Sequence, residues 1–106
     1  MRYAYQDLGE QAKGTTAIVR WTGAAADVML LDPVNFVKYT EGRNPVMYSG
    51  GGHFRRAPAE LEVPEDGRWY VVADLRGYST QARATVELVS AESGQTEREE
   101  VLVAAG

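Results

Sequence analysis

Gly67-Arg68-Trp69-Tyr70-Val71-Val72-Ala73-Asp74-Leu75-Arg76-Gly77-Tyr78 is the stretch of sequence that decides the fold. Between its two flanking turns, aromatic and branched residues alternate with the period of a β-strand. One face of this strand would carry Trp69, Val71, Ala73 and Leu75, and the other would carry Tyr70, Val72 and Asp74. Because one face is wholly apolar and the other nearly so, the pattern predicts a central strand packed on both sides.

Segments before and after this stretch also show strand patterns. They cover residues 3–8, 15–22, 26–31, 46–49, 59–63, 82–89 and 98–103, the last being the weakest because it follows a charged run. Seven or eight short strands separated by turn residues predict an all-β fold, an antiparallel β-sandwich of jelly-roll type. The chain is long enough for one domain, so residues 1–106 are expected to form a single sandwich.

The strand rhythm breaks after residue 31. Asp32 can accept hydrogen bonds from the free amides of a first helical turn, and Pro33 suits the first helical position. The sequence therefore predicts one short helical turn that Asp32 caps and Gly42 terminates. Gly50-Gly51-Gly52 is expected to lack regular structure, because glycine loses the most backbone freedom on ordering.

Composition limits the classes of function. The net charge is -4, which argues against nucleic-acid binding because that activity depends on a basic surface. The chain has no cysteine, and no apolar run is long enough to span a bilayer. We therefore expect a cytoplasmic domain that binds neither nucleic acid nor membrane.

Several short motifs, by order and spacing, resemble a known family of small bacterial domains. They are Asp7-Leu8-Gly9, Ala26 to Asp32, Gly51-Gly52-His53, Val63-Pro64, Trp69 to Val72 and Gly77-Tyr78. The family is catalogued as domain of unknown function eighteen eighty-three, and the resemblance covers residues 1–90. It implies a non-catalytic domain that occurs alone or ahead of a TIR domain. Residues 91–106 lie outside it, as an extra strand or tail. A looser likeness is to the sandwich module C-terminal to secreted bacterial proteases.

The best candidate for a binding site surrounds the only histidine. His53 follows three glycines and precedes Arg55-Arg56, so a ligand could approach the backbone while the guanidinium groups bind a phosphate or carboxylate. The alternative is a glycine hinge with solvated side chains, since no phosphate-loop spacing is present. An arginine pair beside glycines is expected to be exposed, because burying an unpaired charge is costly.

Asn35 and Tyr39 lie on the same excursion of the chain, residues 32–56, and could converge with this site. The structural alternative is a capped helix whose tyrosine covers apolar surface. Asp27, Asp32, Asn35 and Asp74 offer oxygen ligands for calcium, but their spacing matches no known calcium loop. We predict no metal, no cofactor and no catalytic residues, because no nucleophile has a base at a recognisable spacing.

Two functions remain from the sequence. The first is a binding or interaction module without catalysis, acting on another protein or on a second copy of itself. The second is a small-molecule sensor for an anionic ligand, such as a nucleotide or sugar phosphate, using His53, Arg55, Arg56, Asn35 and Tyr39. A concave site that holds several of these residues together would favour the sensor.

Overall fold

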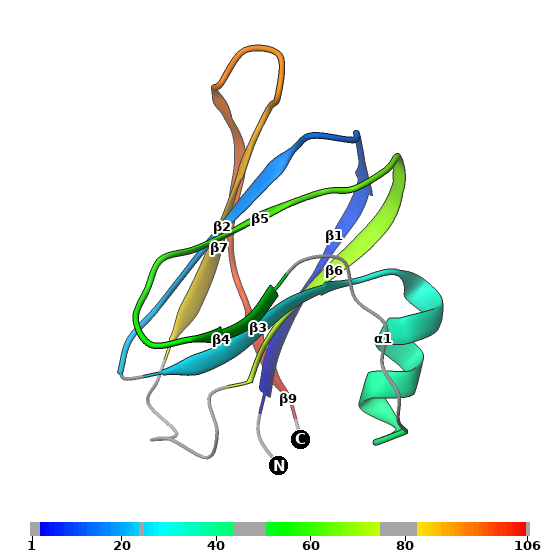
Figure 1. Cartoon of the computed structure of the whole chain (residues 1–106), viewed down its shortest axis with the longest axis vertical. Helices are drawn as coiled ribbons and strands as arrows, with labels where there is room; N and C mark the ends of the chain where they lie inside the picture. The colour runs from blue at the N-terminus through cyan, green and yellow to red at the C-terminus, as the bar shows by residue number, and fades with distance from the viewer. Residues whose placement is uncertain (1–2, 24, 44–50, 75–82, 106) are drawn as a thin grey trace.

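The computed structural model describes residues 3–23, 25–43, 51–74 and 83–105. These residues form two antiparallel sheets that pack face to face, with one helix outside them (Figure 1). The strands are β1 (Tyr3–Gln11), β2 (Thr16–Trp21), β3 (Ala26–Leu31), β4 (Gly51–Phe54), β5 (Ala59–Glu62), β6 (Gly67–Asp74), β7 (Ala84–Val89), β8 (Thr96–Val101) and β9 (Val103–Ala105). The predicted all-β sandwich is confirmed.

The five-stranded sheet has the order β4-β3-β6-β1-β9, and the four-stranded sheet has the order β5-β2-β7-β8. The chain changes sheet at most of its connections, as expected for a jelly-roll type of sandwich. β6 pairs with β1 on one side and with β3 on the other, so the predicted central strand is confirmed. Its last expected inward residue, Leu75, lies outside the described residues.

The hydrophobic core lies between the two sheets. β6 contributes Trp69, Val71 and Ala73, each at most 6% exposed. The other strands contribute their predicted inward sets, which include Ala17, Val19 and Trp21 from β2, Ala26, Val28 and Leu30 from β3, and Ala59 and Leu61 from β5. The period-two patterns therefore identified the buried face of each of these strands correctly.

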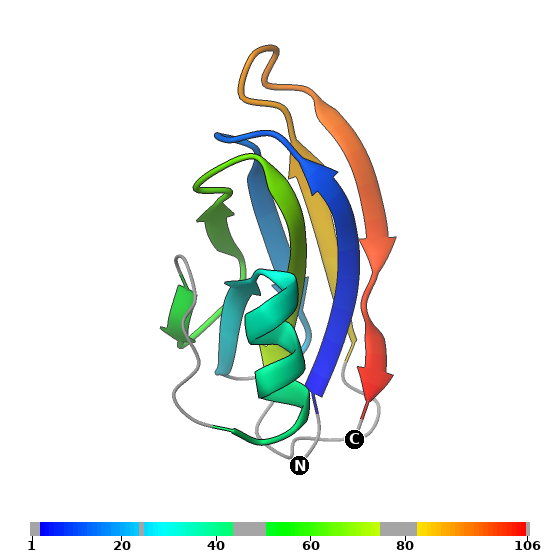
Figure 2. The same ribbon diagram turned by 90° about the vertical axis from the view of Figure 1, so that its right-hand side faces the viewer.

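Helix α1 (Pro33–Thr40) covers the outer face of the five-stranded sheet (Figure 2). Asp32 is its N-cap, as predicted: its Oδ1 accepts a hydrogen bond from the Asn35 amide at 2.8 Å, and Pro33 occupies the first turn. Phe36 stacks on Tyr70 of β6 with ring centroids 4.1 Å apart and planes 4° apart. This contact explains why the second face of β6 is also apolar.

Three glycines lie within strands where the sequence predicted none or an end. The expectation that Gly51 and Gly52 lack regular structure is wrong, because both belong to β4, which pairs with β3. At Gly51, with φ of +111°, a Cβ atom would lie 2.3 Å from the Val28 carbonyl oxygen. Only glycine permits this close approach of the two strands. Gly9, with φ of +70°, forms a bulge inside β1 and does not end it. The predicted strand 46–49 lies outside the described residues.

The C-terminal segment supplies an edge strand to both sheets. β8 pairs with β7 as the predicted hairpin requires. Leu102 then enters the core at 5% exposure, and β9 crosses to the other sheet to pair with β1. The single predicted strand 98–103 is therefore divided between two sheets. Because of this division and of β4, the described strands number nine instead of seven or eight.

Candidate functional site

The structure separates the five predicted site residues into three places. Asn35 lies at the N-terminal end of α1, where its amide nitrogens donate to Asp32. His53 lies on β4 opposite Asp27, at the other end of β3. The four residue steps from Asp27 to Leu31 alone span about 13 Å of strand. Asn35 therefore does not share a site with His53, and its observed role is in the helix cap.

Tyr39 and His53 do return to one region, on the outer face of the five-stranded sheet. There the strand registers place His53, Asp27, Asp74 and Tyr3 side by side across β4, β3, β6 and β1. His53 Nδ1 lies 2.8 Å from Asp27 Oδ1, and the Tyr39 hydroxyl donates to Asp74 Oδ2 at 3.3 Å. We call His53, Asp27, Asp74 and Tyr39 the polar row.

The electrostatics of the polar row disfavour an anionic ligand. Asp27 and Asp74 are directly opposed across β3 and β6, so two carboxylates lie within one row. Burial, and after it the charge of Asp74, raises the pKa of the Tyr39 phenol well above its ordinary value, which keeps it a neutral donor. The Tyr39 ring also packs edge-on against Tyr3, with centroids 5.1 Å apart.

A metal centre is not found among the described residues: no group of three histidine or acidic side chains there could hold an ion. Asp32 and Asn35 form the helix cap, and Asp27 lies at the opposite end of β3. The four oxygen donors considered from the sequence therefore do not form one site.

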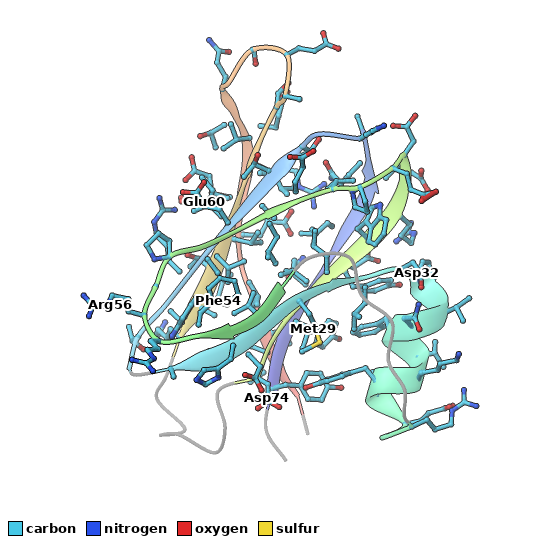
Figure 3. All side chains as sticks on the ribbon, viewed as in Figure 1. Met29, Asp32, Phe54, Arg56, Glu60 and Asp74 are labelled. Atoms are coloured by element: carbon cyan, nitrogen blue, oxygen red, sulfur yellow. The ribbon has the colours of Figure 1, made fainter. Side chains whose placement is uncertain are left out.

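Arg55 and Arg56 lie in the connection from β4 to β5, where they are exposed as expected. Phe54 and Ala57 anchor this connection by packing against the core. β5 then pairs with β2 so that Ala59 is opposite Val19, which brings the connection alongside the C-terminal end of β2. The two arginines therefore lie on the side of the four-stranded sheet, and Figure 3 shows Arg56 on the side of the molecule away from α1.

Two further arginines lie at this same end of the sandwich. Arg20 is on the outer face of β2, one residue before that strand ends. Arg83 precedes β7 and lies beside Thr22: the Thr22 amide donates to the Arg83 carbonyl at 2.9 Å, and the Arg83 amide donates to Thr22 Oγ1 at 3.0 Å. We call Arg20, Arg55, Arg56 and Arg83 the arginine end. All four are exposed.

Three members of the arginine end, Arg55, Arg56 and Arg83, differ from the other described arginines in their pairing. Arg43, Arg68 and Arg98 each form an ion pair, with Glu41 at 2.7 Å, with Asp7 at 2.5 Å and with Glu100. Arg20 pairs with Glu87 at 2.9 Å. Within the described part of the chain, the side chains of Arg55, Arg56 and Arg83 have no hydrogen-bonding or carboxylate partner. Three uncompensated guanidinium groups therefore lie at one end of an acidic domain.

Sequence reasoning found Arg55 and Arg56 but missed the other members of this group. Arg20 and Arg83 are 63 residues apart and reach the same end only because β2 pairs with β7. Alternation along the strand predicted that Arg20 points outward, but it did not predict which residue of another strand lies beside Arg20. Asp27 and Asp74 were noted as oxygen donors, but their pairing with each other also depends on strand register.

Comparison with known proteins places the chain in a family but assigns it no activity. No curated protein and no solved structure is significantly similar to it. No described helix is long and apolar enough to cross a membrane. The model of a family described as a domain of unknown function, DUF1883, matches residues 1–92, which include every element from β1 to β7. β8 and β9 follow that match. The chain therefore belongs to the DUF1883 family of domains of unknown function.

Proposed function

We propose that this domain is a non-catalytic interaction module that binds an acidic segment of a partner protein through the arginine end. The observation that carries the proposal is the group of exposed guanidinium groups of Arg55, Arg56 and Arg83, which have no side-chain partner among the described residues. Arginine provides a planar set of donors that fits carboxylates in a bidentate way. It stays charged at any physiological pH, so this site supplies fixed charge and not proton transfer.

The alternative is a sensor for a small anion such as a nucleotide or sugar phosphate. Its five predicted residues would have to converge, and Asn35, His53 and the arginines lie in separate places. The polar row, where His53 and Tyr39 lie, contains two carboxylates, Asp27 and Asp74, that would repel a phosphate. An exposed set of arginines also fits an extended acidic chain better than a small molecule, which usually binds in a concave site.

The family resemblance supports the same proposal. The resemblance implies a domain that stands alone or ahead of a TIR domain, and recognition of a partner would be useful in either place. On this proposal the module acts in the cytoplasm, in keeping with a chain that lacks cysteine.

Fluorescence anisotropy with a labelled oligo-glutamate peptide tests the proposal directly. The wild-type chain should bind the peptide at low salt, and binding should weaken as added salt screens the charges. The double variant Arg55→Gln, Arg83→Gln should bind at least tenfold more weakly, by analogy with other charge-assisted contacts. Its melting temperature should stay close to the parent value, because both side chains are exposed.

The matched control is the double variant Arg43→Gln, Arg68→Gln, which removes the same charge from two paired arginines elsewhere. This control should bind the peptide like the wild type. Equal loss in both variants would show a general charge effect and contradict the site. Inorganic phosphate and ATP serve as small-anion competitors, and tighter binding of ATP than of the peptide would favour the sensor.

A further inference from the structure

The outer face of the four-stranded sheet is an uncovered surface in the described structure. Helix α1 covers the corresponding face of the other sheet, and no described element lies over this one (Figures 1 and 2). Strand alternation and register place eleven side chains on it: Thr16, Ile18, Arg20, Glu60, Glu62, Thr85, Glu87, Val89, Thr96, Glu99 and Val101. We call this surface the open face.

Charges on the open face are separated by sign along the strands. The arginine end borders one edge of it, where β2 ends and β7 begins. Toward the other edge, Glu60 and Glu87 both lie opposite Ile18, and Glu99 lies opposite Glu87. Glu62 lies one row farther, opposite Thr16. Four residue steps separate the Thr22 row of the arginines from the Ile18 row of Glu60 and Glu99, and six steps separate it from the Thr16 row of Glu62, which corresponds to about 13–20 Å of strand.

Three glutamates of the open face, like three arginines of the arginine end, have no ion-pair partner among the described residues. Within the described residues, the side chains of Glu60, Glu62 and Glu99 form no ion pair or hydrogen bond. The open face and its border therefore carry three unpaired anions at one end and three unpaired cations, Arg55, Arg56 and Arg83, at the other. Figure 3 shows one member of each set, Arg56 and Glu60, on the same side of the molecule.

The Ile18 and Arg20 rows of the open face also carry an ion pair and two apolar side chains. Arg20 and Glu87 form an ion pair at 2.9 Å, and Thr96 also donates a hydrogen bond to Glu87. These hydrogen bonds, from Thr96 and from Arg20, hold the pKa of the Glu87 carboxyl below its ordinary value. Ile18 and Val101 lie on the same surface, and Val101 is 62% exposed. Exposed apolar side chains among the charged ones supply the apolar contact area that an interface contains.

We propose that the partner of the open face is a second copy of this chain, docked antiparallel about a two-fold axis. This inference rests on the proposed function and names its partner. In the antiparallel arrangement the arginine end of each copy faces the glutamates of the other, so the unpaired charges of each face lie toward charges of the opposite sign. A parallel arrangement would place arginine against arginine and glutamate against glutamate. The face thus contains both halves of its own electrostatic complement.

The expected dimer is weak and depends on concentration. Four strands about 4.8 Å apart and six residues of strand give a face roughly 19 Å by 20 Å, which is small for a stable interface. Charge pairs at the rim of such an interface contribute mainly to orientation and to the rate of association. The dimer should therefore dissociate when salt screens the charges.

Sedimentation velocity on the full chain, over a range of concentrations at low salt, tests the inference. The wild type should form a dimer, which high salt should dissociate. Two charge-reversal variants should each associate at least tenfold more weakly alone. Glu60→Lys, Glu62→Lys makes the glutamate end net cationic, with Glu99 retained, and Arg56→Glu, Arg83→Glu removes the net positive charge of the arginine end. Mixing the two variants should restore a heterodimer, because each face then complements the other.

The control variant is Glu41→Lys, Arg43→Glu, which reverses an exposed ion pair beyond the end of α1 and should dimerise like the wild type. A wild-type chain that stays monomeric throughout overturns the inference, as does a mixture that does not associate. The proposed function is tested separately, because Glu60→Lys, Glu62→Lys keeps the arginine end. That variant should lose dimerisation and still bind the oligo-glutamate peptide. If the wild type is monomeric but binds the peptide, only the inference of a second copy is refuted. If the wild type also fails to bind the peptide, the proposed function is refuted as well.

Discussion

The outer faces of the two sheets differ in whether another element of the described structure covers them. On the five-stranded sheet, Phe36 of α1 stacks on Tyr70, so the second side of β6 is buried under a helix. On the four-stranded sheet, Glu60, Glu62 and Glu87 occupy the equivalent outward positions, and no described element covers them. The polarity of the outward residues of a strand therefore indicates whether another element covers that face of the sheet. An apolar second face requires a cover, whereas a charged one is suited to solvent or to a partner.

The core between the sheets is common to both faces and should show the largest effect. Trp69→Ala removes the largest inward side chain of β6, which is 6% exposed and donates from Nε1 to the Glu65 carbonyl at 3.0 Å. We expect a loss of about 3–5 kcal/mol in the free energy of unfolding. That loss is comparable with the whole stability of many domains of this size. Urea denaturation followed by circular dichroism measures it, and a melting temperature within a few degrees of the parent would contradict the assigned core.

The difference between the two faces is tested by one substitution on each. Phe36→Ala removes the ring that stacks on Tyr70 and should lower the free energy of unfolding by about 2 kcal/mol, because a half-buried aromatic contact is lost. Ile18→Ala, on the open face, should cost less than about 1 kcal/mol in the monomer.

Both free energies are measured by urea denaturation at protein concentrations low enough to dissociate a dimer. Equal costs for the two substitutions would show that the helix does not distinguish the faces. An Ile18 effect that appears only at high protein concentration would support an interface on the open face.

A smaller effect than those of Trp69→Ala and Phe36→Ala is expected from removing the hydroxyl of Tyr39. Tyr39→Phe removes the hydrogen bond to Asp74 and should cost about 1 kcal/mol at neutral pH. The pKa of this phenol is raised in the folded state, chiefly by burial and then by Asp74. Its contribution is therefore complete below the ordinary tyrosine pKa of about 10 and is lost as the pH rises beyond it.

Unfolding experiments between neutral and alkaline pH check this sign. The stability of the wild type should fall more steeply above about pH 10 than that of Tyr39→Phe, because the unfolded wild type can ionise this phenol. In a spectrophotometric titration of the folded protein, the variant should lack one late-ionising tyrosine. Parallel pH profiles for the two proteins would show that Tyr39 titrates as an exposed phenol.

The sequence by itself was sufficient for most of the strands, for their buried faces and for the start of the helix. Trp69, Val71 and Ala73 alternate with the period of a strand, and Asp32-Pro33 has the chemistry of a helix N-terminus. These features depend on residues a few positions apart, and local geometry fixes their relations. The exposure of Arg55 and Arg56 was predictable for a similar reason, since the cost of burying an unpaired charge does not depend on the fold.

Only the tertiary structure decided which distant residues meet. Gly51 belongs to a strand because β4 pairs with β3, and glycine is required there because the Val28 carbonyl leaves no room for a Cβ atom. Arg83 joins Arg20 because β2 pairs with β7, and Asp27 meets Asp74 because β3 pairs with β6. The same holds for the C-terminal segment, whose alternation indicates a strand but not that Leu102 turns it from one sheet to the other. Alternation specifies which way a side chain points, but register between strands that are far apart in the sequence depends on the packing of the whole core.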